Sequence, residues 1–560
     1  MSPAPSRRSR LRVVLFSGGR GSGALTTQLV SNPRIDLVLA INGYDDGAST
    51  GEVRRFLGDA LGPSDFRKNA SRLARALRTA PEPLVELLDL RLRDDLVDGC
   101  MARRLAAVVG SGTGENPSLE GPARLSAALP EVARFLVQAR LARFADELAT
   151  GGRTFRFDDT SLGNLVFSGS YLLVGRDFNR AVDDYCVLLG LPAGLVENVT
   201  SGTDAHLVAI DADGRLLGSE EDIVDAKRKN RIKDIYLLRS RLTEADLTAL
   251  QSAGAEELAT QLAARQASVA INPRLASAIA QADLIIYAPG TQHSSLFPSY
   301  LTPGLSDAIA ANLQAIKLLV TNIQADAEIT GSSAVDIIER AVYYLKEKGR
   351  LAIPTPCLIT HYLLNDPQHA ESDTPYVPLG RLDSLEDPRL VRVGNYEDGV
   401  TGRHDATKIL GPFVDAFVER WDAVQRVAVY FHDAGSTTKV VQSILEMVRG
   451  GIRDMPVEIT IFHDGPAALE GSFVESIDVP VTRLEGALAQ QDQQLRAALQ
   501  AGGFDYVVLF ESSGMYNGED IANLASHLSL GRLDAVWGSR RLSVKDIHAS
   551  YRLKYRHRTV

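Results

Sequence analysis

Two short apolar runs near the N-terminus each stop at a glycine-rich loop, and this pairing restricts the fold more than any other feature. Residues 11–16 lead into residues 17–23 (SGGRGSG), and residues 35–41 lead into residues 45–51 (DDGASTG). An apolar run that ends at glycines is typical of a buried parallel strand followed by a tight loop. Backbone N–H groups of such a loop can close around an anion, and adjacent aspartates supply oxygen ligands for Mg²⁺. The two loops therefore predict a site for a diphosphate and a metal ion.

Composition limits the classes of function. The 560 residues carry a formal net charge of −10, which argues against general nucleic-acid binding. The three cysteines lie far apart and form no CxxC pair, so neither a disulfide frame nor a zinc knuckle is indicated. Residues 1–10 are basic and predict a disordered tail. A signal peptide is not expected, because no long apolar segment follows them. Since no run reaches the roughly 18 apolar residues that span a bilayer, we expect a soluble cytoplasmic protein without a membrane span.

The order of apolar and helical patterns predicts an α/β fold with a doubly wound, mostly parallel, Rossmann-like sheet. We expect this domain at residues 11–364, with strands at 284–288 and 315–320, a helix at 305–313 and a helical insertion at about 80–150. Residues 365–420 are rich in proline, glycine and polar residues and predict a linker or irregular extension. A second, smaller α/β domain is expected at residues 421–560, with strands at 427–431, 457–462 and 506–510 and a helix at 437–449.

Taken alone, each glycine loop permits several interpretations. The first is not a Walker A loop, because no Gly-Lys-Ser/Thr follows, and its glycine spacing is not GxGxxG. An acidic pair some 20 residues later is compatible with a dinucleotide oxidoreductase, in which one carboxylate binds a ribose. That interpretation leaves the second carboxylate and the second glycine loop unexplained.

Four later motifs make the pattern specific. Residues 62–69 (GPSDFRKN), 161–165 (SLGNL), 288–291 (APGT) and 320–328 (VTNIQADAE) follow in that order. With the two opening loops, the series resembles the family that includes the 2-phospho-L-lactate transferase CofD and the YvcK-type proteins. The resemblance covers residues 11–350.

The resemblance implies a doubly wound fold that binds a nucleoside-diphosphate-linked small molecule with Mg²⁺. The CofD branch transfers a phospholactyl-type group from a guanosine diphosphate conjugate to a deazaflavin alcohol and releases GMP. The YvcK branch binds a UDP-sugar and acts in carbon metabolism or cell-envelope regulation. We expect a Mg²⁺-dependent transferase, with a UDP-sugar-binding regulator as the alternative. The sequence names neither base nor acceptor, and it leaves a homo-oligomer open.

The same resemblance assigns roles to individual residues. Asp45 and Asp46 are candidates for the metal, or for the base that takes the acceptor proton, and Arg67 is the candidate diphosphate clamp. The remaining candidates would bind the phosphates, the nucleotide or the acceptor: Gly18, Gly19, Gly21, Ser22, Ser49, Thr50, Asp65, Asn69, Asn164, Gly290, Thr291, and Ser294 or Ser295.

Purely structural interpretations compete with these roles. Asp65 and Asn69 are strong helix-capping residue types, and Asn164 could satisfy a turn. Asp326 and Glu328 could form a solvated strand end, and His293 is interpreted as a polar lining residue because no second histidine has suitable spacing.

Three departures from the family pattern put the substrate in doubt. Arg20 stands where a threonine is usual, residues 158–160 stand where YvcK-type relatives often carry Gly-His, and Lys68 is inserted before Asn69.

The C-terminal residues resemble the nucleotide-binding half of a family-two glycosyltransferase of the GT-A fold. The Asp-x-Asp that active members place after a strand is replaced here by Glu511-Ser512-Ser513, and one carboxylate is a poor substitute for two. We expect a degenerate sensor or scaffold domain, with glycosyl transfer as the weaker alternative.

Overall fold

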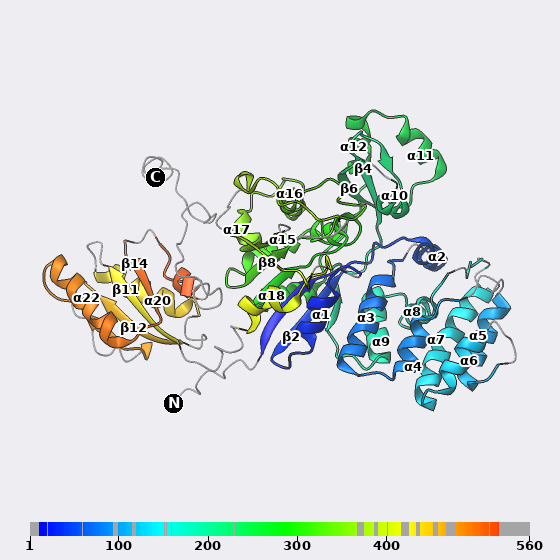
Figure 1. The fold of residues 1–560 in the computed structure, drawn as a ribbon, viewed down its shortest axis with the longest axis horizontal. Helices are drawn as coiled ribbons and strands as arrows, with labels where there is room; N and C mark the ends of the chain where they lie inside the picture. The colour runs from blue at the N-terminus through cyan, green and yellow to red at the C-terminus, as the bar shows by residue number, and fades with distance from the viewer. Residues whose placement is uncertain are drawn as a thin grey trace. The chain divides into compact units, whose positions relative to one another are not determined.

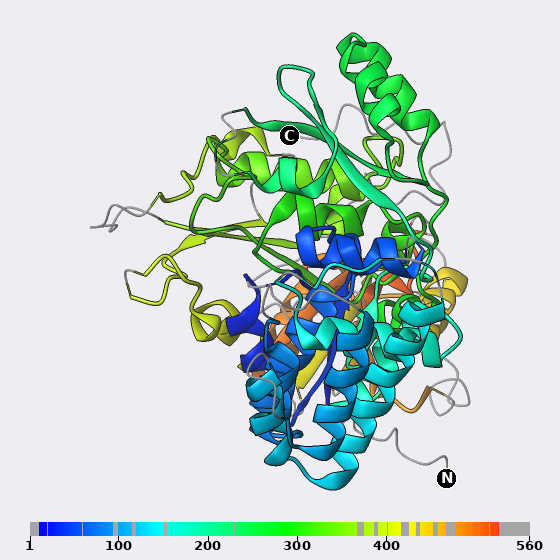
Figure 2. The ribbon, with the colours of Figure 1, turned by 90° about the vertical axis from the view of Figure 1, so that its right-hand side faces the viewer.

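The computed structural model describes most of the chain, and Figures 1 and 2 show it from two sides. The described residues are 10–19, 21–58, 60–92, 99–114, 119–150, 152, 154–157, 159–225, 227, 230–366, 375–385, 390–399, 401–415, 425–432, 437–451, 457–465, 477–513, 516–522 and 524–525. Two compact units are present. One comprises Arg12–Asn312 with Lys317–Thr407, and the other comprises Lys408–Val560 with Met1–Leu11 and Leu313–Ile316. The expected tail at residues 1–9, Arg20 and Asp158 lie outside the described residues.

A seven-stranded parallel sheet with the order β10-β9-β8-β7-β1-β2-β3 forms the centre of the first unit. Its strands are β1 (Leu11–Phe16), β2 (Ile35–Ile41), β3 (Val196–Asn198), β7 (Leu284–Tyr287), β8 (Ile316–Val320), β9 (His361–Asn365) and β10 (Val391–Gly394). The predicted α/β fold with a mostly parallel sheet is confirmed. The strands are mostly apolar because parallel strands are covered on both faces, and β7 and β8 are buried at every residue.

The strand order reverses between β1 and β7. From β1 the chain proceeds outward to β2 and β3, and from β7 it proceeds in the opposite direction to β8, β9 and β10. Because adjacent loops diverge at such a reversal, ligands of open α/β sheets bind there, beyond the carboxyl ends of the strands. The loops that follow β1 and β7 therefore mark the expected position of a site.

Helices connect these strands, and the segment between β2 and β3 is almost entirely helical. The segment expected as a helical insertion contains α4 to α7, which lie together with α3, α8 and α9 on one side of the sheet in Figure 1. The helices up to β3 are α1 (Gly23–Val30), α2 (Ala48–Leu57), α3 (Ser64–Leu77), α4 (Glu82–Asp89), α5 (Gly99–Ser111), α6 (Glu120–Ala127), α7 (Glu131–Thr150), α8 (Leu162–Leu173) and α9 (Phe178–Leu188).

A small subdomain that the sequence did not reveal lies between β3 and β7. It contains an antiparallel sheet of order β5-β4-β6 and protrudes at the top of both ribbon views. Its elements are β4 (His206–Asp211), β5 (Leu216–Leu217), α10 (Glu220–Val224), β6 (Ile232–Leu238), α11 (Glu244–Gln251) and α12 (Ala255–Ala264). Val208, Tyr236 and Leu258 belong to a hydrophobic cluster of its own.

The remaining elements of the first unit follow the subdomain. They are α13 (Pro273–Gln281), η2 (Gln292–Leu296), α14 (Phe297–Tyr300), α15 (Leu305–Ala311), α16 (Ala334–Leu345), α17 (Thr355–Leu358) and η4 (Leu382–Ser384). Part of the segment expected as a linker thus supplies β10, an edge strand that pairs with β9. After it come α18 (Ala406–Leu410) and η6 (Gly411–Asp415).

The second unit contains a four-stranded parallel sheet of order β13-β12-β11-β14. Its elements are β11 (Gln425–His432), α20 (Thr437–Arg449), β12 (Val457–His463), β13 (Val481–Arg483), α22 (Leu488–Gly502) and β14 (Tyr506–Glu511). The expected strands and helix are present, whereas residues 534–540 of the glycosyltransferase-like pattern lie outside the described residues. The GT-A resemblance therefore stays a prediction.

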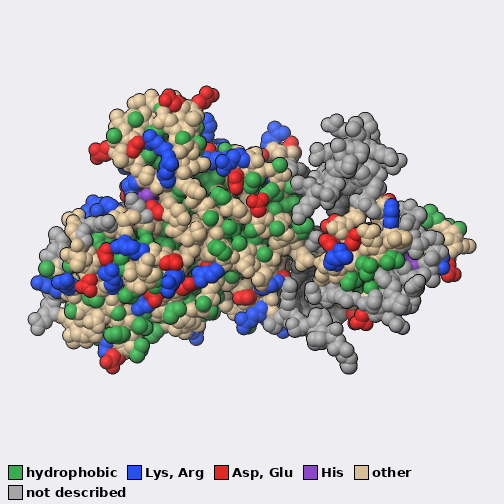
Figure 3. Space-filling view, turned by 180° about the vertical axis from the view of Figure 1, so that it is seen from behind, with side chains coloured by type: hydrophobic (Ala, Val, Ile, Leu, Met, Phe, Trp, Pro, Cys, Tyr) green, Lys and Arg blue, Asp and Glu red, His purple; other side chains and the backbone are tan. Residues whose placement is uncertain are grey.

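Among the described residues, no helix is both long enough and apolar enough to cross a membrane. Acidic and basic side chains are interspersed on the face of the first unit drawn in Figure 3.

Candidate functional site

The glycine loops after β1 and β7 meet at the reversal of strand order. A methyl group built on Gly21 would lie 2.5 Å from Gly290 Cα and 2.8 Å from Pro289 O, and one built on Gly18 would lie 2.6 Å from Ser295 Cβ. Only glycine permits this approach of backbone to backbone. Gly290 has φ 153°, which also favours glycine. Ser22, at the start of α1, shares a 2.5 Å hydrogen bond with Ser17.

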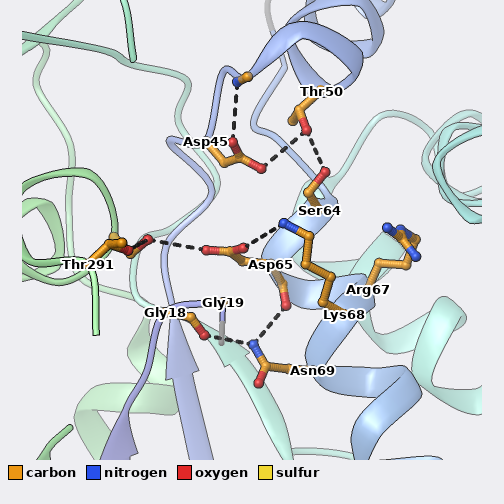
Figure 4. Close-up of polar contacts among 12 residues, drawn as sticks. Gly18, Gly19, Asp45, Thr50, Ser64, Asp65, Arg67, Lys68, Asn69 and Thr291 are labelled. Atoms are coloured by element: carbon orange, nitrogen blue, oxygen red, sulfur yellow. Dashed lines mark hydrogen bonds and ion pairs between the residues drawn. The ribbon is translucent and has the colours of Figure 1, made fainter. Parts of the chain in front are cut away.

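Asp65 connects these loops to the second glycine loop. It lies in the first turn of α3, and a methyl group on Gly19 would come within 2.9 Å of its carboxylate. Lys68 lies 3.4 Å from Asp65 Oδ1, and Ser295 Oγ lies 3.5 Å from Asp65 Oδ2. Figure 4 shows Asp65 at the centre of these contacts. Burial and the nearby charge of Asp45 raise the pKa of Asp65.

Asn69, one turn further along α3, holds the first loop in place. Its side-chain amide donates to Gly18 O at 3.0 Å and to Asp65 O at 2.8 Å. Pro63 precedes the helix, and Asp65 and Asn69 lie inside it, so the interpretation of these two residues as N-caps is wrong.

Asp45 lies in the second loop and faces Asp65. Its carboxylate accepts hydrogen bonds from Gly47 N at 3.3 Å and from Thr50 Oγ1 at 3.2 Å, and Thr50 also contacts Ser64. Burial opposes ionisation of Asp45, but the hydrogen bond with Glu220 and the charge of Lys68 outweigh it and lower its pKa. Burial and the charge of Asp45 raise the pKa of Glu220 well above its ordinary value. The pair therefore favours an ionised Asp45 beside a protonated Glu220.

Asp46 points to a different set of partners. Its Oδ1 lies 2.9 Å from Arg241 Nη2 and 3.6 Å from Arg54 Nη1, and its backbone N–H donates to Glu220. The two adjacent aspartates thus have distinct surroundings: Asp45 faces other carboxylates, whereas Asp46 is neutralised by guanidinium groups.

Arg67 and Asn164 contact each other beside the loops. Arg67 Nε donates to Asn164 Oδ1 at 3.1 Å, and its Nη1 lies 2.8 Å from Asp89 Oδ1. Asn164 Nδ2 donates to Ser49 Oγ at 2.9 Å. The Arg67 guanidinium is separate from the dashed contacts around Asp65 in Figure 4, and in this structure it connects α3 to α8 and to the end of α4. Because Asn164 lies within α8, where Ser161 is the cap, its interpretation as a turn residue is wrong.

Hydrogen bonds to the carboxylate of Glu328 hold the loop after β7 in place. The Glu328 carboxylate accepts from the backbone N–H groups of His293 at 2.7 Å and Ser294 at 3.0 Å, and from Ser294 Oγ at 2.5 Å. Only 3% of Glu328 is exposed, so the interpretation as a solvated strand end is wrong for this residue. Burial raises its pKa to about 7. Thr291, at the mouth of the loop, donates to Ser295 at 2.9 Å.

Several backbone N–H groups at this edge have no hydrogen-bond partner among the described residues. They belong to Gly18, Gly19, Gly290 and Ser49, and Ser49 lies in the first turn of α2. Unpaired amides at loops and at a helix N-terminus are the donors that bind phosphate oxygens in proteins. The site therefore combines amides without a partner among the described residues with the carboxylates of Asp45 and Asp65.

The fit of Mg²⁺ can be judged from these donors. No group of three or more His, Cys, Asp or Glu side chains in the described part of the chain is arranged to hold a metal ion. Mg²⁺ is usually held by one or two carboxylates together with substrate phosphates and water, so a preformed cage is not required. The lowered pKa of Asp45 suits that use, whereas Asp46 already faces two cationic side chains.

Sequence reasoning missed four residues that shape this site. Asn42 follows β2 and donates to Ser295 O and to Ser299 Oγ, which joins the second loop to the loop after β7. Arg54, Glu220 and Arg241 contact the second loop, but Glu220 and Arg241 come from the subdomain, about 175 and 195 residues further along the chain. No local pattern marks such distant contacts.

Comparisons with known proteins agree with this picture. The family model for 2-phospho-L-lactate transferase CofD matches residues 13–376. A putative gluconeogenesis factor of Thermotoga maritima is 27% identical over 418 residues, covering 73% of this chain and 100% of the relative. The uncharacterized protein YNL011C of Saccharomyces cerevisiae is 24% identical over 400 residues, covering 60% of this chain and 86% of the relative.

Two crystal structures of protein BH3568 from Bacillus halodurans, one of them described as a member of the UPF0052 family, are also similar. Each is 19% identical, with TM-scores of 0.46 and 0.47. They cover 71% and 72% of this chain and 98% and 100% of the matched chains. Since the family model spans well over half of the sequence, the chain belongs to the 2-phospho-L-lactate transferase CofD family.

Proposed function

We propose that the chain is a transferase that binds a nucleoside-diphosphate-linked small molecule at the carboxyl edge of the large sheet and passes its distal phosphoryl-linked group to an alcohol. The observation that carries this proposal is the convergence of the loops after β1 and β7 at the reversal of strand order, with amides of Gly18, Gly19 and Gly290 unpaired among the described residues. Family membership supports the same class of ligand.

In the proposed reaction, the diphosphate oxygens accept hydrogen bonds from the loop amides and from the first turn of α2. The acceptor oxygen forms a bond to the distal phosphorus, the bond from that phosphorus to the bridging oxygen breaks, and the nucleoside monophosphate leaves. Asp45 would hold Mg²⁺, which would neutralise charge on the diphosphate. Asp65 is proposed to take the acceptor proton, because burial and the charge of Asp45 raise its pKa and make it a stronger base than an ordinary carboxylate.

A second candidate is a regulator that binds a UDP-sugar and performs no chemistry. The specific observation in its favour is the Thermotoga maritima relative, whose whole length is covered and which is described as a putative gluconeogenesis factor. Both candidates use the same loops, so they differ in turnover and not in binding.

Calorimetric titration with GDP and with UDP, each with and without Mg²⁺, tests the shared part of the proposal. We expect Mg²⁺-dependent binding that Asp45→Asn weakens by about 10-fold or more, because the variant loses an ionised ligand. Asp36→Asn is the matched control, since Asp36 is exposed on β2 and lies outside the site. Unchanged titrations of Asp45→Asn would contradict the metal role. Release of the nucleoside monophosphate from a conjugate in the presence of an alcohol acceptor would separate the transferase from the regulator.

A further inference from the structure

The subdomain of β4, β5, β6 and α10 to α12 is anchored to the rest of the first unit by two shielded cations, Lys348 and Arg54. Lys348, just after α16, forms an ion pair with Asp234 at 2.9 Å and lies 3.5 Å from the centre of the Tyr236 ring. Arg54 of α2 donates to Asp204 Oδ1 at 2.9 Å and to Ala205 O at 2.7 Å, at the start of the subdomain. Both cations are shielded from solvent, so these contacts fix where the subdomain lies on the sheet.

From this position the subdomain reaches the second loop with two side chains. Glu220, at the start of α10, accepts the backbone N–H of Asp46, and Arg241, three residues beyond β6, forms an ion pair with the Asp46 carboxylate at 2.9 Å. About 45% of the Arg241 side chain is exposed, whereas 10% of the Asp46 side chain is exposed. The Arg241 guanidinium is therefore partly exposed to solvent, and the carboxylate that holds it is buried.

The surroundings of Asp46 are a poor match for a metal ligand. Its Oδ1 is shared by Arg241 and Arg54, and a divalent cation at this oxygen would have to displace or oppose two positive charges. Asp45, one residue earlier, faces Asp65 and Glu220 instead. The adjacent aspartates thus differ in what they can bind.

We infer that Asp46 is a positioning residue that holds Arg241 of the subdomain over the diphosphate, and that Arg241 binds the phosphate oxygens. The inference rests on the proposed function, which supplies the diphosphate. A guanidinium has five N–H donors in a planar fork, so the Nη2 contact with Asp46 leaves donors that can form charge-assisted hydrogen bonds with phosphate. Asp46 lies two residues before the start of α2, so the ion pair places the guanidinium at the same glycine loop that leads into the N-terminus of this helix.

The test is a mutant cycle read by calorimetry with GDP and with UDP at several Mg²⁺ concentrations. Arg241→Met and Asp46→Asn are each expected to weaken nucleotide binding by about 10-fold or more, the usual effect of losing a charge-assisted hydrogen bond. The double variant should bind no more weakly than Arg241→Met, because Asp46 acts through Arg241. Arg239→Met is the matched control, since Arg239 is an exposed cation two residues earlier that contacts Ala264 O.

The Mg²⁺ dependence distinguishes a positioning role from a metal-binding role. For Asp46→Asn, the Mg²⁺ concentration that gives half of the maximal effect should stay as in the wild type, whereas Asp45→Asn should raise it. A raised Mg²⁺ requirement in Asp46→Asn would overturn the inference. So would nucleotide affinities of Arg241→Met that equal those of Arg239→Met, even when the wild type binds nucleotide as proposed. A wild type that binds neither nucleotide would refute the proposed function and this inference together.

Discussion

Arg54 offers the most direct test of how the second loop is held. It is fully buried in α2, and it donates to the backbone oxygens of Ala60, Tyr44 and Asp45 at 3.0, 3.1 and 3.3 Å. Its Nη2 also contacts Asp204 and Ala205. The substitution Arg54→Met keeps most of the aliphatic volume and removes every one of these donors.

The expected loss of stability in Arg54→Met comes from the buried carboxylate and carbonyl groups that would lose their donor. Removing one partner of a buried ion pair destabilises a protein by about 3–5 kcal/mol, because the other charge stays buried without compensation. Asp204 is 19% exposed and can regain part of its hydration, which favours the lower end of this range, but the buried carbonyl groups would also lose a donor. We therefore expect Arg54→Met to lower the free energy of unfolding by about 3 kcal/mol, a large fraction of the roughly 5–15 kcal/mol of a typical domain.

Urea unfolding followed by circular dichroism measures this change. Arg124→Met is the control, since Arg124 is an exposed cation on another helix, α6. The double variant with Asp204→Asn should lose less than the sum of the single effects, because it removes both charges of the pair. A loss below about 1 kcal/mol for Arg54→Met would refute the reasoning that this network holds the second loop.

Two further predictions concern the loops after β7 and β1. Burial raises the pKa of Glu328 from 4.5 to about 7, so between these values the folded state holds a proton that the unfolded state has lost, and stability falls as pH rises. This pKa difference corresponds to about 3 kcal/mol in the free energy of unfolding. The variant Glu328→Gln should lack this pH dependence when unfolding by urea is measured across the pH range. A Glu328→Gln variant with the same pH dependence as the wild type would contradict the prediction. Gly21→Ala should abolish nucleotide binding while the circular dichroism spectrum is retained, because its methyl group would lie 2.5 Å from Gly290 Cα. Gly254→Ala is the control, since a methyl group there meets no atom within 4 Å, and equal nucleotide affinities of the two variants would exclude a role for the close loop contact.

Buried parallel strands were the part of the fold that the sequence predicted best. The runs at residues 11–16 and 35–41 match β1 and β2, and those at 284–288 and 315–320 match β7 and β8 within one residue at each end. A strand covered on both faces must be apolar at nearly every position, so its signal is local and needs no knowledge of its neighbours.

Edge and antiparallel strands were missed for the opposite reason. β10 has exposed or half-exposed residues throughout, lies in a segment rich in proline and polar residues, and pairs with β9 alone. β6 contains Lys233 and Asp234 within an apolar run, and its partner β4 lies more than 20 residues earlier. Such strands are specified by the surface on which they pack, which the local sequence does not display.

For the candidate site, the sequence identified loops that the fold brings together, but not what each side chain contacts there. Asn69 and Asn164 occupy motif positions, yet their amides bind Gly18 O and Ser49 Oγ, which are parts of the other loops. A motif residue can therefore be required because it shapes a neighbouring loop instead of contacting a ligand. The two roles share one sequence signal, and only the contacts in the folded chain separate them.

This distinction bears on how the adjacent aspartates are interpreted. In the sequence, Asp45 and Asp46 are equivalent carboxylates at the end of a strand. In the fold, successive side chains point to different surroundings, so Asp45 meets Asp65 while Asp46 meets the cations of α2 and the subdomain. A pair of carboxylates that looks like a metal site thus separates into one candidate metal ligand and one anchor for a phosphate-binding arginine. Because that arginine is contributed by the subdomain, changes in the subdomain should alter ligand affinity even where both glycine loops stay the same.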